Sequence, residues 1–211
     1  MRRFFIVLGC LVTALALAPP AQASIVIDFG TGAGTGGLFT GTALGGTGTL
    51  IPLDVLKVTT DGNPQQVFNL SGTGTGDANG AAVMSFVYGT AGNSITIVGG
   101  VPALNIPDGT TLLSGSFTSF LFTMPTDIAG GGGSGTGADT KDAGLLKALG
   151  IDPATQFAFF GFVITLPASE PPWTTNSVDI QNTAVPEPGS MLLLGTGLLG
   201  LASVVRRRLR K

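Results

Sequence analysis

The sequence predicts an all-β fold: an antiparallel, sandwich-like body with one short helix, between an N-terminal signal peptide and a C-terminal single membrane helix. Short stretches rich in β-branched and aromatic residues recur between Gly, Asn, Asp and Pro, which is typical of strands and turns. Each end of the chain carries an apolar run beside arginines. These observations divide the chain into a signal peptide (1–23), an all-β body with Gly/Thr-rich segments (24–166), a linker (167–184) and a C-terminal anchor segment (185–211).

The N-terminus has the layout of a cleavable secretory signal. Arg2 and Arg3 precede an apolar stretch over 4–18, and the small residues Ala21 and Ala23 mark a signal-peptidase site. The stretch is shorter than the roughly 20 residues that a membrane-spanning helix needs. We therefore expect export through the Sec translocon and cleavage before Ser24.

The composition of the remaining chain excludes several kinds of chemistry. Cys10, inside the predicted signal, is the only cysteine, and the sequence has no histidine. The mature protein would then lack disulfides, Cys or His metal ligands, and catalysis that needs an imidazole or a thiolate. Between Ser24 and Val185, eleven acidic and three basic residues give a net charge of −8, which disfavours nucleic acid as a partner.

Seven stretches of the body are predicted to be strands. They are residues 25–29, 50–60, 66–70, 81–88, 95–98, 112–123 and 157–166. Gly62, Gly80, Gly92 and Gly109, each beside Asn or Asp, are predicted to supply the positive φ angles that tight turns between strands require. Short strands with frequent turns favour an antiparallel sandwich.

The stretch 115–123 shows the clearest alternation of the strand period. It predicts that Ser116, Thr118, Phe120 and Phe122 face one way, and that Phe117, Ser119 and Leu121 face the other. Phe117 should therefore lie on the opposite face of the sheet from Phe120 and Phe122.

One helix is expected in the second half of the body. Asp139 can cap its start, Leu145, Leu146 and Leu149 form an apolar stripe, and Gly150 can end it.

Three further segments are expected to be irregular. The glycine-rich run 130–137 is predicted to be a flexible loop. The Gly/Thr-rich segment 30–48 is expected to be mobile or a set of tight turns, because ordering glycine costs backbone entropy. The Pro- and Asn-rich linker 167–184 should hold at most one short strand, around Val178 and Ile180.

An enzyme without His or Cys would have to use carboxylates, such as a pair acting on a glycosidic bond. Most Asp residues of the body stand beside Gly or Asn or at the expected helix start, where bonding to backbone N–H groups explains them. We therefore expect a non-catalytic protein without a cofactor. Calcium is the alternative, although the loop beginning at Asp77 has Tyr88 where an EF-hand loop needs Glu.

The C-terminus carries an apolar run and then basic residues. The run, which is the expected transmembrane segment, comprises Met191, Leu192, Leu193, Leu194, Gly195, Thr196, Gly197, Leu198, Leu199, Gly200, Leu201, Ala202, Ser203, Val204 and Val205. As a helix it would span roughly 22 Å, less than the ~30 Å hydrocarbon core, so it suits a provisional anchor. The basic anchor that should stay in the cytoplasm is Arg206, Arg207, Arg208, Arg210 and Lys211.

Val185, Pro186, Glu187 and Pro188 stand ahead of this run. The prolines fix φ and lack N–H groups, so the stretch is extended and cannot join a following helix. These residues alone leave open a permanent anchor whose helix the prolines merely end. Together with the apolar run and the basic residues, they resemble the PEP-CTERM sorting signal of Gram-negative bacteria that make extracellular polysaccharide.

The resemblance implies that an exosortase, a membrane-embedded cysteine transpeptidase-like enzyme, recognises Pro186, Glu187 and Pro188 and removes the tail. It implies export across the inner membrane, transient anchoring there, and then release or attachment at the cell surface or in the matrix. The body would be a biofilm-matrix component associated with exopolysaccharide. A carbohydrate- or calcium-binding module and a carboxylate-based polysaccharide hydrolase are the alternatives.

Overall fold

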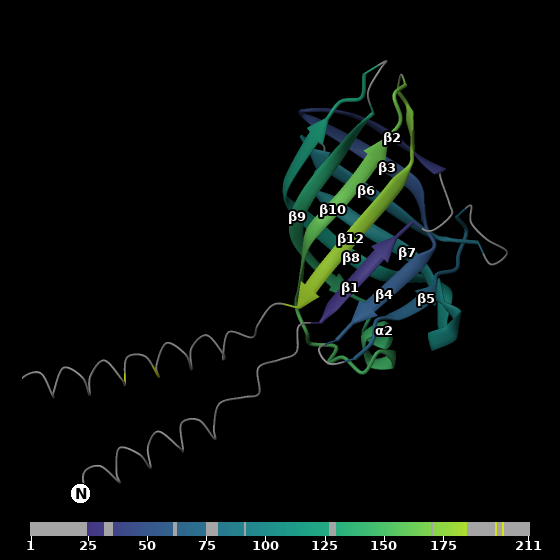
Figure 1. The fold of residues 1–211 in the computed structure, drawn as a ribbon, viewed down its shortest axis with the longest axis vertical. Coiled ribbons are helices and arrows are strands. Elements are labelled where there is room, and N and C mark those ends of the chain that lie inside the picture. The colour runs from purple at the N-terminus through teal and green to yellow at the C-terminus, as the bar shows by residue number, and fades with distance from the viewer. Residues whose placement is uncertain are drawn as a thin grey trace, which may run out of the picture. The chain divides into compact units, whose positions relative to one another are not determined.

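The computed structural model describes residues 25–31, 36–60, 63–74, 80–90, 92–126, 130–169 and 171–184, together with Gly197 and Gly200. The chain divides into two compact units, and the unit Ser24–Val185 contains all the strands (Figure 1).

Twelve strands form one antiparallel sheet in the described part of the chain. They are β1 (Val26–Gly30), β2 (Gly36–Thr42), β3 (Gly45–Leu53), β4 (Val55–Thr59), β5 (Gln66–Asn69), β6 (Ala82–Gly89), β7 (Ser94–Val101), β8 (Ile106–Thr123), β9 (Gly131–Lys141), β10 (Phe157–Leu166), β11 (Trp173–Thr175) and β12 (Ser177–Ala184). Their order across the sheet is β11-β2-β3-β6-β7-β8-β9-β10-β12-β1-β4-β5. The predicted all-β antiparallel class is confirmed, but one continuous sheet replaces the two sheets of a sandwich.

The sheet curls until strands four places apart face each other across its concave side. Phe39 on β2 and Phe122 on β8 have ring centroids 4.9 Å apart, and Phe86 on β6 lies 5.1 Å from Phe162 on β10. Four strand spacings measure about 19 Å along a flat sheet, so only a strongly bent sheet brings these rings together. Figure 1 shows the bend, with β10, β12 and β1 passing in front of the rear part of the sheet.

Aromatic side chains fill the concave side, and glycines on the strands make room for them. The rings in mutual contact are those of Phe39, Phe86, Tyr88, Phe117, Phe120, Phe122, Phe162 and Trp173. A Cβ atom at Gly48 would overlap the Phe86 ring, and one at Gly135 would lie 2.8 Å from the Phe117 ring. Much of the glycine excess therefore belongs to packed strands.

Two glycine-rich segments consequently differ from their predictions. The flexible loop predicted at 130–137 is wrong, because Gly131–Lys141 is strand β9, paired with β8 and β10. The segment 30–48 contains β2 and part of β3, which pair with each other. The entropy cost of ordering glycine is real, but contact of the flat glycine strands with aromatic rings offsets it.

A register shift on β8 changes which side chains face inward. The pairing with β9 slips between Phe117 and Ser119. Phe117 therefore packs on the concave side with Phe120 and Phe122, and the predicted separation of these rings is wrong. Leu121 faces outward and is 71% exposed. Such a bulge bends a strand locally, in keeping with the curl of the sheet.

The predicted short helix is α2 (Ala143–Ala148), which begins later than expected. Asp142 rather than Asp139 caps it, since the Asp142 carboxylate accepts a hydrogen bond from the Leu145 N–H at 2.7 Å. Leu145 is buried, and Gly150 follows the helix at φ +73°, as predicted for its end. The short 3₁₀ helix η1 (Pro102–Leu104) joins β7 to β8.

The stretch 167–184, predicted to be a linker, contains β11 and β12. β12 pairs with β10 on one side and with β1 on the other. Val178 and Ile180 face the core as the predicted short strand required, but the strand continues because Asn182 is also buried. The apolar pattern did not predict this continuation, because Asn182 is polar although it is buried. The sheet therefore extends to Ala184 rather than ending at 166.

Candidate functional site

The residues predicted to direct export and sorting lie outside the described part of the chain. This applies to Ala21, Ala23 and Ser24 at the expected signal cleavage, to 185–188, and to the apolar run and basic anchor apart from Gly197 and Gly200. Among the residues that the structure describes, no helix is long and apolar enough to cross a membrane. The described residue that directly precedes the predicted motif is Ala184, at the end of β12.

The sheet holds β12 up to the residue that precedes the predicted motif. Ala184 pairs with Phe157 of β10, and its N–H donates to the Ile25 carbonyl at 3.0 Å. Thr183 pairs with Val26 of β1. The start of β1 and the end of β12 therefore lie side by side (Figure 1).

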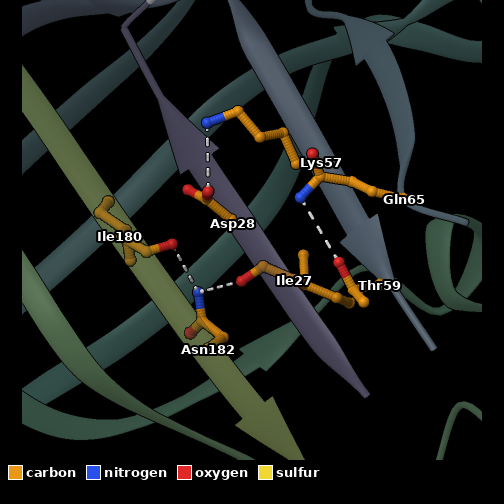
Figure 2. A network of polar contacts seen from close by, with 7 residues as sticks. All are labelled: Ile27, Asp28, Lys57, Thr59, Gln65, Ile180 and Asn182. Carbon is orange, nitrogen blue, oxygen red and sulfur yellow. Dashed lines mark hydrogen bonds and ion pairs between the residues drawn. The ribbon is translucent and has the colours of Figure 1, made fainter. Parts of the chain in front are cut away.

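Asp28, Lys57 and Asp179 form a charged cluster on the convex face, on the neighbouring strands β1, β4 and β12. Lys57 Nζ lies 3.3 Å from the Asp28 carboxylate, as Figure 2 shows. The pKa of Asp179 is raised to about 6 by burial, by a hydrogen bond with Asp28 and by the negative charge of Asp28, while Lys57 lowers it. The Asp179 carboxyl group is therefore half protonated near pH 6.

Asn182 secures the same strands from the concave side. It is fully buried, and its Nδ2 donates to the carbonyls of Ile27 and Ile180, both at 3.2 Å (Figure 2). Gln65 donates to the hydroxyl of Thr59, the last residue of β4, at 3.4 Å. Side-chain hydrogen bonds therefore reinforce β1, β4 and β12, the three strands that carry the charged cluster.

Asp139 and Lys141 form a second ion pair, enclosed on the concave side of β9. The Lys141 Nζ lies 2.7 Å from Asp139 Oδ1, and neither side chain is exposed. The ammonium group also lies 4.1 Å from the centre of the Phe157 ring. Burial raises the pKa of Asp139 and lowers that of Lys141 to about 8, while their mutual attraction opposes both shifts. Because the pair is closed to solvent, we assign it a structural role.

The convex cluster holds two carboxyl groups and the enclosed pair holds one, so neither offers three acidic ligands for a metal ion. Within the described residues, no three side chains from His, Cys, Asp and Glu gather where they could hold a metal ion. Asp77, the start of the calcium-like loop, lies outside the described residues.

Hollows open on the described surface of the body, and two of them lie beside polar side chains. One, of about 440 Å³, is lined by Pro102, Asn105 and Ile106, and in it the buried Ser71 hydroxyl donates to the Asp108 carboxylate. The other, of about 250 Å³, lies over β8, β9 and β10 and is lined by the exposed side chains of Leu121 and Val163 and by several Ser, Thr and Gly residues. The second hollow carries no charged side chain.

The convex face from β2 across to β10 is almost uncharged. Some of its exposed strand positions are apolar, such as Leu50, Leu121 and Val163. Many others carry hydroxyl side chains, among them Thr40, Thr42, Thr49, Ser85, Ser94, Ser114, Ser116, Ser119, Thr123, Ser134, Thr136, Thr140 and Thr165. Some of these pair across strands, as Ser119 does with Thr136 at 2.8 Å. Asp108, at the start of β8, is the exposed charged residue of these strands. Such a face suits an uncharged polar partner better than an ionic one.

Comparison with known proteins identifies the end of the chain. The family model of the PEP-CTERM protein-sorting motif matches residues 184–208. The chain carries a PEP-CTERM sorting motif. No curated protein and no solved structure matches the chain. The match covers the segment in which the sequence predicted the motif, and it assigns no activity to the body.

The PEP-CTERM motif indicates export, sorting to the cell surface and an exosortase as the processing partner. Its first matched residue, Ala184, is also the last residue of β12. The sheet and the PEP-CTERM segment therefore follow each other directly, where the sequence predicted 18 residues of linker between body and motif.

The sequence did not predict the polar clusters of this PEP-CTERM protein. Asp28, Lys57 and Asp179 lie far apart in the sequence, and the strand order β12-β1-β4 brings them together. Lys57, between the core residues Leu56 and Val58, could have been placed on the outer face from alternation alone. Which outward residues become neighbours depends on the order and register of the strands, and no local pattern specifies these.

Proposed function

We propose that the chain is an exported, non-catalytic component of the surface or extracellular matrix of a Gram-negative bacterium, associated with exopolysaccharide in a biofilm. After export through the Sec translocon and transient anchoring in the inner membrane, an exosortase recognises Pro186, Glu187 and Pro188 and removes the tail. The match of the sorting motif to residues 184–208 carries this proposal.

The surface of the body supports a matrix role. Sugars present many hydroxyl groups and few charges, and the exposed Ser and Thr side chains of the convex face can both donate and accept hydrogen bonds. The net charge of −8 between Ser24 and Val185 disfavours nucleic acid and keeps the protein soluble outside the cell.

The hollow over β8, β9 and β10 favours a second candidate, a carbohydrate-binding module. Its Leu121 and Val163 side chains can contact the apolar face of a sugar ring, while Ser119, Ser134 and Thr136 can bond the ring hydroxyls. Titration with a neutral glucan such as dextran tests this candidate. Binding that Val163→Asp abolishes and Val67→Asp leaves intact would favour it, because both valines are exposed but Val67 lies on β5.

The intact mass of the protein collected outside the cell tests the sorting proposal. The expected mass lacks both the signal peptide and the C-terminal apolar run with its basic residues. Glu187→Ala should leave a longer, membrane-bound form, whereas Glu170→Ala, at the other glutamate of the chain, should be processed normally. A full-length C-terminus on extracellular protein would contradict the proposal.

A further inference from the structure

The end of β12 is paired on both sides up to its last residue. Ala184 is opposite Phe157 of β10, and its N–H donates to the Ile25 carbonyl at 3.0 Å. One residue earlier, Thr183 lies between Val26 of β1 and Ala158 of β10. Figure 1 shows β12 between these two strands. An enzyme that pulls on the chain at this point therefore pulls on a central strand of the sheet.

The sorting residues follow this strand at very short range. Pro186, Glu187 and Pro188 come two to four residues after Ala184. Four extended residues reach about 14 Å, so the whole tripeptide must stay close to the end of the sheet while β12 remains paired. A processing enzyme has to bind its substrate within that short distance.

The backbone donors near the motif are few, and the sheet already uses one of them. Peptides bound in extended form are held largely through their main-chain N–H and C=O groups. Pro186 and Pro188 have no N–H, so the donors from Ala184 up to Glu187 are the N–H groups of Ala184, Val185 and Glu187. The Ala184 N–H is bonded to Ile25. An enzyme that binds the chain on this side of the motif competes with β1 for that donor.

We propose that the last pairs of β12 with β1 and β10 must separate before the exosortase can act on the motif, so that the pairing of β12 sets the rate of tail removal. The proposal rests on the proposed function, because it assumes that the tail is removed at this motif. In this protein the folded sheet restrains its own processing, and chain added after Ala184 relieves the restraint.

The first test changes the distance between the sheet and the motif in cells that carry the exosortase. Gly-Ser-Gly-Ser inserted between Ala184 and Val185 of the full chain should speed tail removal about tenfold in a pulse-chase experiment, as removal of a barrier of about 1.4 kcal/mol would. The same insertion between Ala43 and Leu44, in the exposed turn after β2, should leave the rate unchanged. Equal rates for the wild type and the Ala184 insertion would overturn the proposal.

The second test locks the end of β12. Because the Ala184 N–H donates to the carbonyl of its opposite residue Ile25, Val26 and Thr183 form the next, non-hydrogen-bonded pair. The Cα atoms of such a pair lie about 4.5 Å apart, a separation that accepts a disulfide. Val26→Cys with Thr183→Cys should slow tail removal about tenfold, and each single variant should be processed at the wild-type rate. A locked chain that loses its tail at the normal rate would contradict the proposal.

Glu187→Ala separates failure of this inference from failure of the proposed function. If this substitution blocks tail removal while the insertion and the lock have no effect, the sorting role stands and the restraint by β12 is wrong. If Glu187→Ala leaves tail removal intact, the motif is not the processing site, and both proposals fail together.

Discussion

At the scale of single residues, the ionisation of Asp179 makes the stability of the folded protein depend on pH. Its pKa rises from 3.8 to about 6 because of burial and of Asp28, so the folded state keeps a proton that the unfolded state has released. The stabilisation that this proton contributes is complete below about pH 4 and is lost as the pH rises through about 6.

Asp179→Asn should therefore stabilise the protein at about pH 7.5 and have little effect at about pH 3.5, where Asp179 is mostly protonated in both the folded and the unfolded state. The expected gain is about 1 kcal/mol, less than the full pKa shift would give, because this side chain is only partly buried and solvent screens its charge. Urea unfolding at the two pH values measures the difference. A gain of equal size at both values would show that the ionisation of Asp179 is not its cause.

The enclosed ion pair gives a second prediction at this scale. Lys141→Met leaves the Asp139 carboxylate buried without its partner and should cost about 3 kcal/mol of unfolding free energy. The double variant Asp139→Asn with Lys141→Met removes both charges and should recover most of that loss. Urea unfolding of the single and double variants measures both values. If the double variant loses as much as the single one, packing rather than charge accounts for the effect.

At the scale of strands, glycines against aromatic rings define the fold. Gly48→Ala should destabilise the protein by about 1–3 kcal/mol, because its new Cβ would overlap the Phe86 ring inside a packed cluster. Gly161→Ala is the matched control, since its Cβ would meet Gln181 at an ordinary 3.5 Å. Its expected effect on the unfolding free energy is within about 0.5 kcal/mol. Equal losses in the two variants would indicate a general cost of replacing strand glycines.

The strands that the sequence predicted correctly are those whose own side chains carry the apolar pattern. Stretches such as 81–88 and 157–166 are rich in β-branched and aromatic residues, and they became β6 and β10. The sequence did not predict β9, because the aromatic rings that pack against its glycines come from β8. The neighbouring strand, rather than the residues of β9 themselves, specifies this strand. The bending of the sheet was not predicted for a similar reason, since it depends on contacts between strands that lie four places apart in the sheet.

In the candidate site, the sorting residues could be read directly, because Val185, Pro186, Glu187 and Pro188 are contiguous and stand before an apolar run and basic residues. Their closeness to the sheet could not be read, because Asn182 breaks the apolar alternation of β12 although it is buried and hydrogen-bonded. A polar residue that satisfies two carbonyls inside the core looks, in the sequence alone, like part of a linker.

At the scale of the whole sheet, β12 should be indispensable. A chain that stops after Leu166 lacks the strand between β10 and β1 and leaves β1, β4 and β5 without their connection to the rest of the sheet. We expect this chain to show no cooperative urea transition, whereas the chain that stops after Ala184 should show one. Comparable cooperative transitions in both would show that β12 is not required for folding.

The neighbouring positions of Ile25 and Ala184 also determine how the sheet can be rewired. Because the Ala184 N–H is bonded to the Ile25 carbonyl, a short loop can join these two residues without disturbing either strand. The chain could then be opened at the exposed turn between Ala43 and Leu44 to give a circular permutant with the same strand order. In such a permutant the new ends would lie at the turn between β2 and β3, and a cargo fused there would be carried at a different place on the sheet.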